Sequence, residues 1–141
     1  MAERTPVEQV HVDRLRRICL ALPEAHEELA WNGVRWRIRT RTFAHVLVVD
    51  AGRPEGLARA AELAGATDPV TVLTFRTPDQ EADVLEQVGR PFFRPTWSGN
   101  IVGMLIEPAT DWTEVAELLT DSFCVQAPAR LAARVDAPPR A

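Results

Sequence analysis

Lysine is absent from the sequence, and all 16 basic residues among the 141 are arginine. The chain is also rich in alanine. The bias therefore reflects genome composition as much as physical selection, and arginine in place of lysine does not by itself indicate bidentate contacts to anions. Cysteine is scarce, and Cys19 and Cys124 each fall in an apolar helical context. Because nothing else suggests a secreted scaffold, this pattern predicts two buried thiols, with one disulfide as the alternative.

Long apolar runs are also missing from the sequence. No segment approaches the roughly 18 apolar residues that a membrane span needs, and residues 1–10 lack the apolar stretch of a secretion signal. We therefore expect no membrane association and a cytoplasmic location. The formal net charge of -4 argues against a general affinity for polyanions, although it leaves room for a local basic patch.

Catalytic and metal-binding sequence patterns are lacking as well. His11, His26 and His45 have no mutual spacing typical of a metal site, and neither cysteine lies near one of them in sequence. The serines lack a nucleophile-elbow context, and there is no glycine-rich phosphate loop. Acidic residues gather on predicted helices, where solvated faces explain them; an iron-binding ridge is the alternative. The sequence predicts no metal and no cofactor, and it favours a binding protein over an enzyme.

The sequence does contain alternating helical and strand-like patterns typical of one domain. We expect this domain to have its core within residues 5–135 and a frayed tail over 136–141. The predicted strands are 34–39, 42–49, 70–76 and 101–107, with a proline-punctuated edge strand or loop at 90–97. These patterns predict an α+β fold with two layers, in which helices pack mainly on one face of an antiparallel sheet of about five strands.

Capping patterns mark the helix starts. Thr5 and Glu8 have the spacing of a capping box around Pro6, which suits the first helical position. Asp111 and Glu114 repeat the pattern before the predicted helix near the C-terminus. These signals predict helices that begin directly after residues 5 and 111.

The segment VRWRIRTR at 34–41 alternates between arginine and other residues. In a strand, this alternation places the arginines on one face and the three residues Val34, Trp36 and Ile38 on the other. If residues 40–41 form the turn, the odd positions of the next strand continue the inward face, and His45 becomes a half-buried core histidine. The predicted cross-strand pairs are Ile38 with Phe43, Trp36 with His45, and Val34 with Leu47.

The outward face of this hairpin is the most unusual feature of an acidic chain. It carries Arg35, Arg37, Arg39 and Arg41, with Arg94 expected to extend the patch from across the sheet. Guanidinium groups bind phosphates in bidentate fashion, which predicts contacts to nucleic-acid phosphates. Two alternatives remain open: a solvated face paired with helix carboxylates, and an interface between two copies, so that the chain is a monomer or a homodimer. The apolar residues expected beside the arginines in such an interface are Ala44, Val46, Val48 and Val72.

Tryptophans beside turns suggest a second kind of site. Trp31 precedes Asn32-Gly33, and Trp97 precedes Ser98-Gly99. With Phe93, these rings predict a cleft for a small molecule, which would make the chain a small-molecule-binding or accessory metabolic protein. The alternative is that the rings cap the ends of the sheet.

Several segments in a fixed order resemble the MmcQ/YjbR family. They are Ala21-Leu22-Pro23-Glu24, the turn at Trp31, Arg41-Thr42-Phe43-Ala44, and Ser122-Phe123 followed by Ala127-Pro128 and Leu131. The resemblance runs from about residue 13 to 135. It implies a CyaY-like α+β fold and DNA binding through a double-wing motif. One wing would be the hairpin 35–43, with Arg41 at the family's usual lysine position, and the other would be the turn at 98–100.

Overall fold

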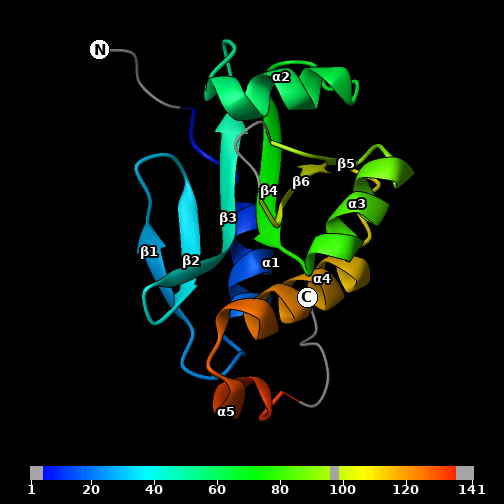
Figure 1. The fold of residues 1–141 in the computed structure, drawn as a ribbon. Helices are drawn as coiled ribbons and strands as arrows, with labels where there is room; N and C mark the ends of the chain where they lie inside the picture. The colour runs from blue at the N-terminus through cyan, green and yellow to red at the C-terminus, as the bar shows by residue number, and fades with distance from the viewer. Residues whose placement is uncertain (1–4, 96–98, 136–141) are drawn as a thin grey trace.

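The computed structural model describes residues 5–95 and 99–135, and within these residues the chain forms one six-stranded antiparallel sheet and five helices. The strand order across the sheet is β1-β2-β3-β4-β6-β5 (Figure 1). The α+β class and the antiparallel sheet are thus confirmed, with one strand more than expected. The strands are β1 (His26–Leu29), β2 (Val34–Ile38), β3 (Arg41–Val49), β4 (Val70–Arg76), β5 (Phe92–Phe93) and β6 (Ile101–Ile106).

Most of the helices cover one face of the sheet, as the sequence predicted. This face buries the larger core, which includes Leu15, Trp36, Phe43, Leu73 and Phe123. Within residues 5–95 and 99–135, the opposite face is covered only near one end, where α2 packs on a smaller cluster. Figure 1 shows α2 lying across the end of β3 and β4. The helices are α1 (Gln9–Cys19), α2 (Glu55–Leu63), α3 (Asp79–Val88), α4 (Trp112–Gln126) and α5 (Ala129–Ala132).

The inward face of β2 is confirmed, but the predicted pairing of β2 with β3 was wrong. The register shifts between Trp36 and Arg37, so that Trp36 lies opposite Ala44 and Phe43 is an extra residue of β3. A β-bulge of this kind reverses which parity of a strand faces the core. His45 therefore lies opposite Arg35 on the second face rather than beside the Trp36 ring.

The reversal of β3 and the cover of α2 together remove the apolar patch that was proposed as a dimer interface. Ala44 and Val46 are fully buried in the larger core, and Val72 is buried in the cluster beneath α2. Val48 is only 8% exposed. None of the four flanks the arginines on an open surface.

Strand β1 was missed because its sequence, HEEL, lacks the apolar alternation of a strand. It is an edge strand, and Leu29 is 87% exposed. Its anchor is Glu27, which accepts hydrogen bonds from the Trp36 indole Nε1 at 2.9 Å and from Arg16 Nε and Nη2 on α1, both at 2.9 Å. These bonds lower the pKa of the Glu27 carboxyl, with Arg16 the main cause. A polar side chain, rather than an apolar stripe, holds this strand.

Two of the remaining local predictions differ from the structure. Helix α1 begins at Gln9 rather than directly after Thr5, because the Thr5 hydroxyl donates to Asp50 at 2.6 Å instead of capping the helix. Cys19 is buried and its thiol is free, as predicted, but Cys124 is exposed on α4. By contrast, Asp111 caps α4 as expected, accepting from the backbone N–H of Thr113 and Glu114. The tail predicted over 136–141 lies outside the described residues.

Candidate anion-binding face of the sheet

Among the described residues, α2 covers only one end of the second face of the sheet. One row of cross-strand partners crosses it, namely Glu28, Arg35, His45, Thr74 and Gly103, from β1 to β6. Partners in one row lie on the same face of the sheet. The fold thus places two hairpin residues, Arg35 and His45, in one row with Thr74 of β4, which lies 29 positions after His45 in the chain.

Strands β3 and β4 part next to this row. Their pairing ends at Ala44 and Phe75, and a serine from α4 takes the place of the next rung. The hydroxyl of Ser122 donates to the Phe43 carbonyl oxygen at 2.6 Å and accepts from the Arg76 backbone N–H at 2.8 Å. The serine of the resemblance motif therefore satisfies the backbone where the strands diverge.

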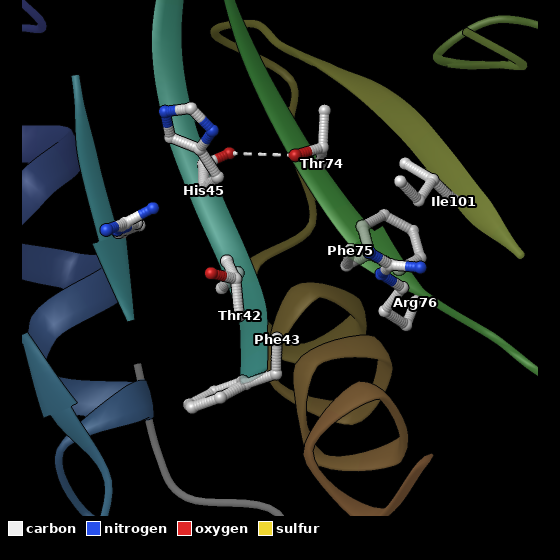
Figure 2. A pocket seen from close by; sticks show the side chains of 9 residues that line it. Thr42, Phe43, His45, Thr74, Phe75, Arg76 and Ile101 are labelled. Carbon is white, nitrogen blue, oxygen red and sulfur yellow. Dashed lines mark hydrogen bonds between the residues drawn. The ribbon is translucent and has the colours of Figure 1, made fainter. Parts of the chain in front are cut away.

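A pocket of about 190 Å³ opens where the two strands part. Figure 2 shows His45 and Thr74 on neighbouring strands, with Arg76 further along β4. The described residues that line it include arginine, histidine and threonine but no carboxylate. They are Arg35, Thr42, Phe43, Ala44, His45, Thr74, Phe75, Arg76 and Ile101.

Two of the four hairpin arginines share one carboxylate. Glu28 Oε2 lies 3.2 Å from Arg35 Nε and 3.0 Å from Arg37 Nη1. These contacts lower the pKa of the Glu28 carboxyl, with the hydrogen bond from Arg37 as the largest cause. Arg37 also donates to the carbonyl oxygen of Thr40 in the turn, and its side chain is only 21% exposed. Arg37 therefore holds the hairpin together, whereas Arg35 keeps a more open position.

The other two arginines lie at the hairpin tip and are exposed. Arg39 adopts a left-handed conformation (φ 57°) in the turn, and its Nη2 lies 3.6 Å from Glu24 Oε1. Within the described part of the chain, Arg41 has no ion pair or side-chain hydrogen bond. Because Glu24 and Glu28 are the only described carboxylates paired with the hairpin, four guanidinium groups face two carboxylates.

Arg76 is a cationic residue of this face that the sequence did not reveal. Its Nη1 donates to the side-chain oxygen of Asn100 at 2.8 Å, and no carboxylate among the described residues pairs with it. The only signal in the sequence is an arginine at the end of a predicted strand. That it borders the same pocket as Arg35 depends on the strand order, which local sequence does not encode.

The imidazole of His45 is oriented by a backbone hydrogen bond. Its Nε2 lies 2.5 Å from the backbone carbonyl oxygen of Asn32, an acceptor, so Nε2 carries the proton. Burial is the main cause that lowers the pKa of His45; the hydrogen bond to Asn32 opposes it, and the charge of Arg35 adds a smaller lowering. With the proton on Nε2, Nδ1 can accept a hydrogen bond, and Figure 2 shows one ring nitrogen of His45 on the side of Thr74.

The other predicted site residues lie apart from this face. Arg94 follows β5 at the opposite side of the strand order from β1, and its Nη1 lies 3.0 Å from Asp83 Oδ1. Trp31 is 80% exposed in the turn after β1, whereas Phe93 is buried on β5, so the sheet separates these two rings. Trp97 and Ser98 lie outside the described residues.

Two features are absent from the described residues. No described helix has the length and hydropathy to cross a membrane. Across 5–95 and 99–135, no group of three or more histidine, cysteine, aspartate or glutamate side chains could hold a metal ion.

Together these features define an α+β protein with one helix-covered sheet face and a second face that is partly open and cationic. Comparison with known families then identifies the group: the chain belongs to the YjbR family, whose model matches residues 20–125. It is similar to the crystal structure of a protein from Pseudomonas syringae solved by the Northeast Structural Genomics Consortium. The two share 13% sequence identity with a TM-score of 0.61, over 86% of this chain and 99% of that chain. No curated protein sequence matches significantly.

Proposed function

We propose that this protein is a non-enzymatic binding protein whose β2–β3 hairpin contacts nucleic-acid phosphates. The observation that carries the proposal is the incomplete neutralisation of the hairpin, in which four guanidinium groups face only two carboxylates. An acidic protein that leaves such a surplus on an exposed tip presents a local site for anions. The chain belongs to the YjbR family. The resemblance to MmcQ/YjbR proteins implies DNA binding, and this supports the same assignment.

The arginines have different roles in this proposal. Arg39 and Arg41 at the tip make the first phosphate contacts, because both are exposed and neither is held by a close ion pair. Arg35 follows on the sheet face, where a phosphate competes with Glu28. Arg37 positions the hairpin through its bond to the turn. Contacts of this kind give affinity with little sequence discrimination.

Binding of duplex DNA measured by fluorescence anisotropy across a salt series tests this proposal. The double variant Arg39→Gln/Arg41→Gln removes the tip charges, and we expect the slope of log affinity against log salt to fall by about 1 for each arginine. The double variant Arg17→Gln/Arg59→Gln is the matched control, since both residues are exposed on helices and it changes the net charge equally. No binding at low salt, or equal losses in both variants, would refute the proposal.

A further inference from the structure

The pocket between β3 and β4 has the charge of an anion site, and it is separate from the hairpin tip. Arg35 borders it from β2 and Arg76 from β4, and no described carboxylate lines it. Arg76 is held by the neutral amide of Asn100. Its full charge therefore remains uncompensated by its neighbours in the described part of the chain.

Hydrogen-bonding groups complete the pocket between the two arginines. The Thr74 hydroxyl lies 3.5 Å from the His45 carbonyl oxygen, at the limit of a hydrogen bond, so it is weakly engaged. When the proton at Nε2, which faces the Asn32 carbonyl oxygen, is the only ring proton of His45, the Nδ1 atom can accept but not donate. An anion that carries one proton satisfies this set, because its charged oxygens take the guanidinium donors while its O–H donates to Nδ1.

The size of the pocket limits the anion to a compact group. Its volume of about 190 Å³ is somewhat larger than the roughly 150 Å³ of an apolar cavity that holds benzene. It is smaller than the roughly 300 Å³ at which pockets for drug-sized ligands begin. It therefore fits one tetrahedral oxyanion with only a few further atoms.

We propose that this pocket binds the phosphate group of a small phosphate monoester, with Arg76 and Arg35 as the charged contacts and with Thr74 and His45 as hydrogen-bonding partners. A phosphate monoester loses its second proton near pH 6, so a singly protonated form is present close to neutrality. A carboxylate such as acetate lacks that proton at neutral pH, and it is the discriminating alternative.

Long-range ¹H–¹⁵N spectra of the imidazole groups test the proposal. The full chain is titrated with inorganic phosphate at pH 6.5, with chloride keeping the ionic strength constant. We expect saturable shifts of the His45 ring nitrogens, assigned with His45→Gln, while His11, which stacks on Trp112 against the other face of the sheet, stays unmoved. Acetate at the same concentration should shift His45 at least 10-fold less effectively.

Variants assign the shifts to the pocket. Arg76→Gln should weaken phosphate binding at least 10-fold, and Thr74→Val, which keeps the β-branched shape, should weaken it by about threefold. Arg59→Gln and the tip variant Arg41→Gln should leave it unchanged, so that this proposal and the DNA-binding proposal can fail independently. An unmoved His45 at 50 mM phosphate, equal shifts with acetate, or undiminished binding by folded Arg76→Gln and Thr74→Val proteins would overturn the assignment.

Discussion

Glu28 partly neutralises the arginines of the hairpin, so replacing it should strengthen the binding of duplex DNA rather than weaken it. Its Oε2 atom is shared by Arg35 and Arg37. A phosphate that approaches Arg35 must displace this contact or compete with its charge. The variant Glu28→Gln removes the charge, keeps an oxygen acceptor for the two arginines and preserves the length of the side chain. We therefore expect tighter binding of duplex DNA with little change in fold.

The size of this effect follows from the charges of the hairpin. Counting Glu24, which also lies 3.9 Å from Arg134 Nη1, for the hairpin alone, four arginines against two carboxylates leave two uncompensated positive charges, and Glu28→Gln raises the number to three. With a slope of about −0.9 per neutralised phosphate, the salt slope should change from about −1.8 to about −2.7. Between 50 and 200 mM salt, the affinity should then fall about 12-fold for the natural chain and about 40-fold for the variant.

Anisotropy titrations of labelled duplex DNA at four or more salt concentrations measure both slopes. Glu62→Gln is the matched control, because Glu62 is exposed on α2 and its replacement changes the net charge by the same amount. Affinity should rise at 50 mM salt for Glu28→Gln and much less for the control. An unchanged slope for Glu28→Gln, or an equal gain for both variants, would show that Arg35 does not meet phosphate.

Two further predictions concern the parts of the fold that hold this face in place. Glu27→Leu leaves the N–H of the fully buried Trp36 indole without its acceptor and should cost about 1–3 kcal/mol in the free energy of unfolding, measured with urea, whereas Glu27→Gln keeps an acceptor and should cost less. The pKa of Glu27 is lowered in the folded protein, so the stability that its charge provides is present above its usual value of 4.5 and is lost as the pH falls through the folded value. The difference in the free energy of unfolding between the natural chain and Glu27→Gln should therefore shrink over that range. A difference that stays constant with pH would contradict the role of the charge. Gly33→Ala should destabilise the hairpin by more than about 2 kcal/mol, because its Cβ would lie 1.9 Å from the Val46 carbonyl oxygen at a φ of 82°. Gly52→Ala, also at positive φ but with nothing within 4 Å, should cost only about 1–2 kcal/mol in the same thermal or urea unfolding measurement, and equal costs would mean that the close approach to β3 is unimportant.

The sequence by itself determined the features that depend on neighbouring residues. Alternation in VRWRIRTR identified the inward residues Trp36 and Ile38, which are both fully buried. The spacing of Asp111 before an apolar helical stripe located the start of α4. Both signals are local, because a side chain's face and a cap are set by residues within one or two turns.

Only the tertiary structure decided which side chains meet on the open face. The extra residue at Phe43 reversed the parity of β3 and moved His45 from the expected core to the second face. The strand order then set Arg76 of β4 beside His45, while Arg94 was left near the far edge of the sheet. Bulges and strand order arise from the packing of distant segments, here including Ser122 of α4 between two diverging strands. The arginine-rich hairpin could therefore be recognised in the sequence, but the pocket that Arg35 and Arg76 border could not.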